Sequence, residues 1–239
     1  MARSGAAFFD LDKTLISRSS TLAFSWPFYR HGLISRTAMI RGAFAQAVFR
    51  RAGADHERME RIRSQASQLC QGWQAERVRE IVSRHLDEII VPHLYAEARA
   101  LVSGHHEAGR DVIVVSASGH EVVDPIAALL GADTVIATTM VIADGRYTGD
   151  VACYVYGEAK AARMRELAAQ RGYQLADCYA YSDSITDLPM LEAVGHPTAV
   201  NPDRALRQLA AARDWPILSF AAPPRRRRQR RLFPIAPIR

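Results

Sequence analysis

The chain has 239 residues, with 31 Lys and Arg against 25 Asp and Glu, and 49% of its residues are hydrophobic. This length and apolar content suffice for a packed core, and they exclude a chain that is disordered throughout. The formal net charge is +6, but seven arginines and no acidic residue lie between Pro223 and Arg239, so the preceding residues are close to neutral.

The first predicted element is a buried strand over residues 6–9, an apolar run that ends on Asp10-Leu11-Asp12. From residue 19 to residue 90, Arg and apolar residues alternate at helical spacing, with breaks at Gly32, Gly53 and Gly72. This pattern predicts three or four helices packed on each other. Most aromatic residues of this stretch are expected to fill the core of the helical bundle: Phe24, Trp26, Phe28, Tyr29, Phe44, Phe49 and Trp73.

After Pro92 the pattern changes to alternating helices and strands. This alternation predicts an α/β fold, a Rossmann-like parallel sheet with helices on both faces, in which the helical stretch is an insertion. Residues 140–143 and 148–152 flank Asp144-Gly145, which has the chemistry of a hairpin turn. Helices are predicted at 94–108, from Gly119 to about Leu130, and at 158–171, 188–194 and 204–213, and strands at 112–115, 134–138, 178–181 and 198–200.

Signals for a compartment are weak. Three scattered cysteines without a CxxC spacing indicate neither a disulfide framework nor a zinc site. The apolar run before Asp10 is too short for a signal peptide, and no window has the 18 or more apolar residues of a membrane span. We therefore expect a cytoplasmic protein.

Two carboxylates, Asp10 and Asp12, end the first strand with one residue between them. Two close acids are unfavourable unless a cation lies between them or one stays protonated. Both outcomes suit chemistry at phosphorus, where one carboxylate attacks as a nucleophile and the other handles the proton of the leaving group. The structural alternative is an Asx turn that only ends a strand.

Further polar residues follow other strands of the predicted sheet, and ligands of such sheets bind beyond the carboxyl ends of the strands. Asp183 and Asp187 follow the strand at 178–181, and Asp183 with Asp10 and a backbone carbonyl would suit Mg²⁺. Ser116 offers a hydroxyl and backbone N–H groups at a predicted helix start, which favour an anion. Lys160 offers a positive charge that would screen a nucleophilic carboxylate from an incoming phosphate.

Lys13 and Lys160 are the only lysines among the 31 basic residues. A coding bias toward Arg with two chance survivors is the simplest explanation. Lys160 acquires a catalytic interpretation from its place in the motifs, whereas Lys13 has no predicted role.

The motifs occur in a recognisable order: Asp-x-Asp-x-Thr at 10–14, the strand-end Ser116, Lys160, and Asp-x-x-x-Asp at 183–187. This order resembles the haloacid dehalogenase superfamily, and within it the phosphoserine phosphatase-like subfamily IB, over about residues 6–215. The resemblance implies a core domain formed by residues 1–18 and 91–222, with a helical-bundle cap of the C1 type at 19–90. Residues 223–239 would then be a basic tail, which we expect to be disordered.

The resemblance implies Mg²⁺-dependent hydrolysis of a small phosphomonoester in two steps. Asp10 would attack phosphorus to form an aspartyl-phosphate, while Asp12 would protonate the leaving alcohol and later deprotonate the attacking water. Asp10, Asp183 and the carbonyl of Asp12 would bind Mg²⁺, with Asp187 orienting a metal-bound water or Lys160. The residues implied to bind or support the phosphate are Thr14, Ser116, Ala117 and Lys160.

The substrate is less well defined, and Ser19 is the position at which the sequence departs most clearly. In phosphoserine phosphatases a Glu after the first motif binds the ammonium of the substrate, and an ungapped alignment from Asp10 places Ser19 there. Ser182 and Thr186 also replace the usual Gly and Asn of the last motif. A phosphomonoester other than phosphoserine is therefore at least as suitable.

Two alternatives stay open. A phosphomutase would pass the aspartyl-phosphate to a second hydroxyl of the substrate instead of water. A binding protein would use the Arg-rich tail and its Leu232, Phe233 and Ile235 on an anionic membrane or on nucleic acid, although the neutral body disfavours nucleic acid. A solubilising tail is the simplest reading of the same residues, and an enzyme held at the membrane periphery would combine both ideas. The oligomeric state is not predicted.

Overall fold

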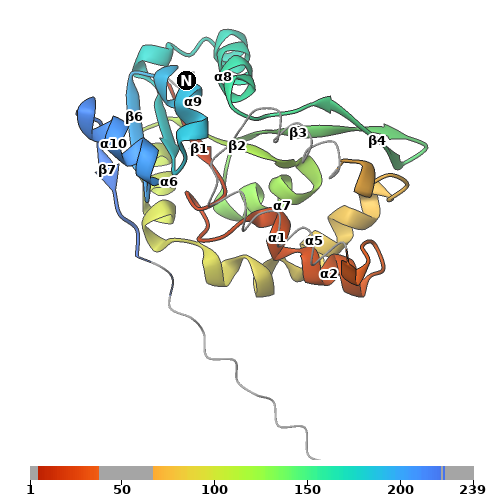
Figure 1. Cartoon of the computed structure of the whole chain (residues 1–239). Coiled ribbons are helices and arrows are strands. Elements are labelled where there is room, and N and C mark those ends of the chain that lie inside the picture. Colours follow the sequence, from red (N-terminus) through yellow and green to blue (C-terminus); the bar gives the residue numbers. More distant parts are fainter. Residues whose placement is uncertain (1–4, 38–66, 222, 224–239) are drawn as a thin grey trace, which may run out of the picture.

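The computed structural model describes residues 5–37, 67–221 and 223 (Figure 1). The expected helices around Phe44 and Phe49, and the Arg-rich segment after residue 223, lie outside these residues. Within the described part of the chain, no helix is both long enough and apolar enough to cross a bilayer. The prediction that the tail contacts an anionic surface stays a prediction.

The described residues form a seven-stranded sheet in the order β4-β3-β2-β1-β5-β6-β7. Every neighbouring pair except β3 and β4 is parallel, which confirms the predicted α/β fold. The two-residue strand β7 was not predicted, because so short a segment has no detectable period. The strands are β1 (Ala6–Asp10), β2 (Asp111–Gly119), β3 (Thr134–Ala143), β4 (Arg146–Cys153), β5 (Tyr179–Ser182), β6 (His196–Val200) and β7 (Ile217–Leu218).

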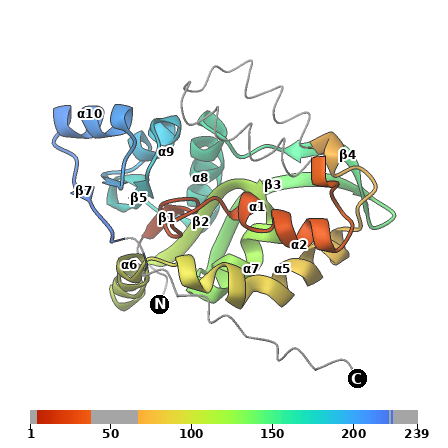
Figure 2. The same ribbon diagram turned by 60° about the horizontal axis from the view of Figure 1, so that its bottom comes forward.

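Two hydrophobic cores lie on opposite faces of the sheet, because successive side chains of a strand point to opposite faces. Ala7 and Phe9 belong to the core with α5, α6 and α7, and Ala6 and Phe8 belong to the core with α8, α9 and α10. Figure 2 shows these two groups of helices on opposite sides of the sheet. The helices are α1 (Ser20–Ala23), α2 (Ser25–Arg30), α5 (Ala75–Ile89), α6 (Ala96–Glu107), α7 (His120–Leu130), α8 (Glu158–Arg171), α9 (Leu188–Glu192) and α10 (Arg204–Ala212). Short 3₁₀ helices lie at η1 (Val91–His93), η2 (Leu175–Asp177) and η3 (Ile185–Asp187).

The described helices of the insertion, α1, α2 and α5, share the core that contains Phe9. Phe24 and Phe28 are buried in it, as predicted for aromatic residues of this stretch. Trp26 is an exception, with an exposed fraction of 56%. Residues four apart share a helix face, so Trp26 lies on the face opposite to Phe24 and Phe28. The division into a core and a cap stays a prediction.

A long β-hairpin connects the sheet to the insertion. The segments predicted separately at 134–138 and 140–143 form one strand, β3, whose second half pairs antiparallel with β4. Asp144 and Gly145 both have a positive φ, 49° and 73°, as a two-residue type I′ turn requires. At the tip, the N–H of Gly72 donates to the carbonyl of Tyr147 at 2.8 Å, and the N–H of Ala75 donates to Gly145 at 3.0 Å.

Replacing Gly195 with alanine is expected to destabilise the fold by about 2–4 kcal/mol, measured by urea unfolding. Gly195 precedes β6, and a methyl group on it would overlap the backbone carbonyl of Ala176. A side-chain rotation cannot relieve an overlap with backbone. The matched control is Gly104→Ala in α6, where a methyl group meets no atom within 4 Å. That variant is expected to be neutral or more stable, and equal unfolding midpoints for the two variants would contradict the prediction.

Candidate active site

Strand register brings three polar positions to the carboxyl edge of the sheet. Asp10 ends β1 and pairs with Val115 of β2, so that Ser116 is the next residue on the neighbouring strand. On the other side Phe9 pairs with Tyr181, which places Asp183 just beyond the end of β5. The parallel sheet therefore places the carboxyl ends of β1, β2 and β5 side by side, as predicted (Figure 1).

Lys160 forms the centre of a buried ion-pair cluster. Its Nζ atom lies 2.6 Å from Oδ1 of Asp10 and 2.8 Å from Oδ2 of Asp187, and all three side chains are buried. The hydroxyl of Ser182 also donates a hydrogen bond to Oδ2 of Asp187, at 2.7 Å. Burial alone would lower the pKa of Lys160, but the carboxylates of Asp10 and Asp187 raise it above its usual value, so the ammonium is charged.

Burial raises the pKa of Asp10 well above its usual value, and the charge of Lys160 lowers it. The pKa of Asp12 is also raised by burial and lowered by hydrogen bonds from Ser20 and Ser19. The N–H of Ser20 donates to Oδ1 of Asp12 at 2.9 Å. The raised pKa of Asp12 favours its protonated form, which an acid that gives a proton to a leaving group requires.

Ser116 is not at a helix start, which corrects the sequence-based expectation. The strand β2 continues through Gly119, and α7 begins at His120. Pairing with β3 extends the strand through this polar segment, since Ser116 aligns with Ala137 and Gly119 with Thr138. The buried hydroxyl of Ser116 accepts a hydrogen bond from the N–H of Ser118 at 3.2 Å.

Thr14 and Ala117 are the other two residues implied in phosphate binding, and they differ in whether their polar groups have hydrogen-bond partners. Thr14 is buried, and its hydroxyl has no hydrogen-bond partner among the described residues. The carbonyl of Ala117 accepts a hydrogen bond from the Thr138 hydroxyl at 2.8 Å. A buried hydroxyl without a partner is uncommon, and in the loop between Asp12 and α1 it is a donor available to a ligand.

The carboxylates of this edge have the composition of a Mg²⁺ site. Burial raises the pKa of Asp183 to about 6, and Lys13 counteracts it. Among the described residues no three His, Cys, Asp or Glu side chains form a complete metal-binding group. Mg²⁺ needs only one or two carboxylates, with waters and a substrate phosphate, and Asp10, Asp183 and the carbonyl of Asp12 fit that donor set. The carboxylates of Asp10, Asp183 and Asp187 contact the ammonium groups of Lys13 and Lys160, and the negative charge that remains would be offset by a divalent cation.

Sequence reasoning missed two residues that organise this site, Ser20 and Asp203. Ser20 and Ser118 hydrogen-bond through their hydroxyls at 2.9 Å and thereby connect α1 to the last residues of β2. Asp203 caps α10 and also accepts a hydrogen bond from the N–H of Ile185 at 2.9 Å, which fixes the loop after Asp183. A capping residue was detectable before α10, but its second contact depends on the folding of residues distant in sequence.

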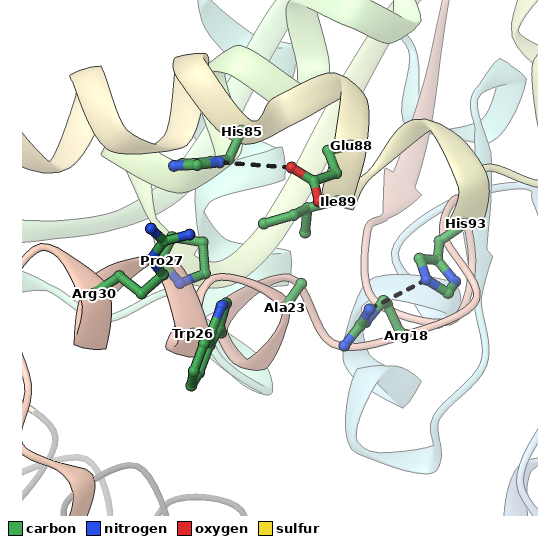
Figure 3. Close-up of a pocket in the computed structure, with 9 residues that line it drawn as sticks. All are labelled: Arg18, Ala23, Trp26, Pro27, Arg30, His85, Glu88, Ile89 and His93. Atoms are coloured by element: carbon green, nitrogen blue, oxygen red, sulfur yellow. Dashed lines mark hydrogen bonds and ion pairs between the residues drawn. The ribbon is translucent and has the colours of Figure 1, made fainter. Parts of the chain in front are cut away.

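A groove of about 390 Å³ lies beside the two segments that join the insertion to the core (Figure 3). Both ring nitrogens of His93 form hydrogen bonds, one with the Ser17 hydroxyl at 3.0 Å and the other with the Arg18 guanidinium at 3.1 Å. None of the clustered carboxylates lines this groove, so it is distinct from the candidate active site. Its lining residues are Arg18, Ala23, Trp26, Pro27, Arg30, His85, Glu88, Ile89 and His93.

A parallel sheet whose carboxyl edge carries buried carboxylates around a charged lysine defines an α/β enzyme suited to reactions of anionic substrates. Comparison with known families makes the class specific. The haloacid dehalogenase-like hydrolase family matches residues 7–192, and the chain belongs to this family of hydrolases.

Relatives named as phosphatases agree with this assignment, and a solved structure shares the fold. The chain is 57% identical over 218 residues to a protein of Mycobacterium tuberculosis named a probable phosphatase, covering 91% of this chain and 76% of that protein. It is 33% identical over 219 residues to a phosphoserine phosphatase of the same species, covering 91% and 71%. A crystal structure of a Bordetella pertussis protein of unknown function aligns with a TM-score of 0.79 at 31% identity, covering 90% of this chain and 97% of that one.

Proposed function

We propose that this chain is a Mg²⁺-dependent phosphomonoester phosphatase that forms an aspartyl-phosphate on Asp10. The observation that carries the proposal is the buried contact of the Lys160 ammonium with Asp10 and Asp187 at the carboxyl edge of the sheet. Membership in a hydrolase family and relatives named as phosphatases support the same reaction class.

In the first step Asp10 attacks phosphorus, because its carboxylate ends the central strand and is held in place by Lys160. Lys160 also offers its positive charge to the phosphoryl oxygens, which lowers the repulsion between a carboxylate and a phosphate dianion. The bond between Asp10 and phosphorus forms as the ester bond breaks, and Asp12 gives a proton to the alcohol oxygen that leaves.

In the second step Asp12, now a carboxylate, takes a proton from the water that attacks phosphorus. Inorganic phosphate leaves and the Asp10 carboxylate is restored, so Asp12 returns to its initial protonated form. The N–H of Ser20 holds Asp12 in one orientation for both transfers. Asp10, Asp183 and the Asp12 carbonyl would hold Mg²⁺, which neutralises phosphate charge. Ser116, Thr14 and the Ala117 backbone are proposed to contact the phosphoryl oxygens.

We further propose that an amino group is not required in the substrate. An ungapped alignment from Asp10 places Ser19 where a phosphoserine phosphatase carries a Glu, and the Ser19 side chain lowers the pKa of Asp12. This arrangement offers a substrate ammonium no carboxylate from this position. The proposed substrate is a small phosphomonoester whose leaving group need not carry a positive charge.

The proposal predicts phosphate release from p-nitrophenyl phosphate in the presence of Mg²⁺, and its loss when EDTA removes the metal. A panel of phosphomonoesters that includes phosphoserine then ranks the leaving groups by kcat/KM. Assays of free phosphate and of isomerised product from the same reaction separate hydrolysis from a phosphomutase reaction. Absence of Mg²⁺-dependent phosphate release from every compound would contradict the proposal.

A further inference from the structure

Lys13 pairs with a carboxylate that the proposed function assigns to Mg²⁺. Its Nζ atom lies 3.3 Å from Oδ2 of Asp183. The Asp183 side chain is 8% exposed and the Lys13 side chain is 46% exposed, so a half-exposed cation contacts a buried carboxylate. Under the proposed function, Asp183 would therefore attract two cations, the Lys13 ammonium and Mg²⁺ from solution.

The backbone at Lys13 indicates that this side chain is not incidental. Lys13 has a φ of 66°, in the left-handed region, which costs a residue with a Cβ about 1–2 kcal/mol and glycine almost nothing. The turn around it is fixed by hydrogen bonds from the N–H groups of Leu15 and Ile16 to the carbonyl of Leu11. Glycine would adopt this φ at a lower cost, so the turn alone does not explain why a lysine occupies this position.

The choice of lysine over arginine fits a contact that can be displaced. Lys13 and Lys160 are the only lysines among 31 basic residues, and both contact carboxylates of this one cluster. A guanidinium binds a carboxylate through two parallel hydrogen bonds, whereas an ammonium is a compact point charge. Among the described residues, Lys13 makes one ion-pair contact, at 3.3 Å, and a divalent cation has twice its charge.

We propose that Lys13 is a tethered counter-ion of Asp183 which Mg²⁺ must displace, so that Lys13 sets how tightly the site binds Mg²⁺. This inference rests on the metal site of the proposed function. Without Mg²⁺, the Lys13 ammonium partly neutralises a buried carboxylate. Once Mg²⁺ binds, the ammonium moves from Asp183 toward solvent, and its charge stays near the position where an anionic substrate arrives.

The test is isothermal titration calorimetry of the full chain with Mg²⁺ at low salt, after EDTA treatment and dialysis. Lys13→Met removes the competing charge with a side chain of similar length, and we expect a Kd about tenfold lower than that of the wild type. Lys13→Arg keeps the charge and allows a two-bond contact, so its Kd is expected to equal or exceed the wild-type value. Arg213→Gln, which removes a surface charge paired with Glu192, is expected to leave the Kd unchanged.

Thermal unfolding provides a readout that does not depend on catalysis. The rise in Tm on adding Mg²⁺ is expected to be larger for Lys13→Met than for the wild type. Lys13→Gln gives the same comparison if Lys13→Met folds poorly. Equal or weaker Mg²⁺ binding by the neutral variants would overturn the inference while leaving the proposed function intact. If neither wild type nor variants bind Mg²⁺, both the inference and the metal dependence of the proposed function are wrong.

Discussion

Lys160→Met is expected to lower the free energy of unfolding by about 3–5 kcal/mol and to reduce phosphatase activity to background. The ammonium is buried and lies within hydrogen-bond distance of both Asp10 and Asp187. Its removal leaves two buried carboxylates without their shared cation, and it also removes a positive charge proposed to bind the phosphate.

The destabilisation by Lys160→Met is expected to depend on pH with a definite sign. Burial already raises the pKa of Asp10, and loss of Lys160 raises it further, so the folded variant binds protons more tightly than the unfolded chain. The loss in stability is therefore largest at high pH, and it shrinks as the pH falls and a carboxyl group becomes protonated. Urea unfolding at pH 8 and at pH 5 measures this difference.

The control for Lys160→Met is Arg165→Met on the same helix. Arg165 contacts Glu158 at 2.8 Å, but its side chain is 50% exposed. Water screens such a pair, so the free energy of unfolding is expected to change by at most about 1 kcal/mol, with activity retained. Equal destabilisation by the two variants would show that the Lys160 contacts have no special energetic role.

Asp10→Asn and Asp12→Asn are expected to block different halves of the reaction. Asp10→Asn removes the nucleophile, so neither product nor a phosphorylated protein forms. Asp12→Asn removes the acid and base, which contribute about 10²–10⁴-fold to such reactions. An aryl leaving group needs little help from a proton, so Asp12→Asn is expected to release one equivalent of aryl alcohol and to stay phosphorylated on Asp10.

Rapid-quench measurement of aryl alcohol and of hydroxylamine-labile phosphate on the protein distinguishes these outcomes. Asp124→Asn is the control, since this exposed carboxylate of α7 contacts only His120 among the described residues and lies outside the carboxylate cluster. Its turnover is expected to stay within about twofold of the wild type. Wild-type turnover by Asp12→Asn would refute the proposed proton transfers. Hydroxylamine-labile phosphate on the Asp10→Asn protein would refute the proposed nucleophile.

The sheet and its active edge were predictable because the strands are short apolar runs that end in acidic or polar residues. Asp10 and Asp183 each follow such a run, and parallel strands place their carboxyl ends together. Strand pairing was not predictable in a segment whose amino-acid composition is typical of a loop. Ser116 to Gly119 has the polar and small residues of a loop, but pairing with β3 holds the segment as strand.

The position of individual side chains depends on contacts that no local pattern contains. Lys13 had no predicted role, because its partner Asp183 lies 170 residues away in the sequence. Trp26 shares the aromatic character of Phe24 and Phe28, and only its place on the opposite helix face explains its exposure. Ser20 contacts both Asp12 and Ser118, and Ser118 lies 98 residues away in the sequence.

The hairpin contacts restrict how the insertion can move against the sheet. Its two connecting segments are themselves joined, since the N–H of Ser17 donates to His93 at 2.8 Å and the N–H of Tyr95 donates to Leu15 at 3.2 Å. The hairpin tip holds Gly72 and Ala75 at a third, distant point. A body attached at both ends cannot swing freely about one hinge. Any movement of α5 away from the sheet would therefore have to bend the β3–β4 hairpin or break its backbone hydrogen bonds to Gly72 and Ala75, and it would also separate α5 from the shared core.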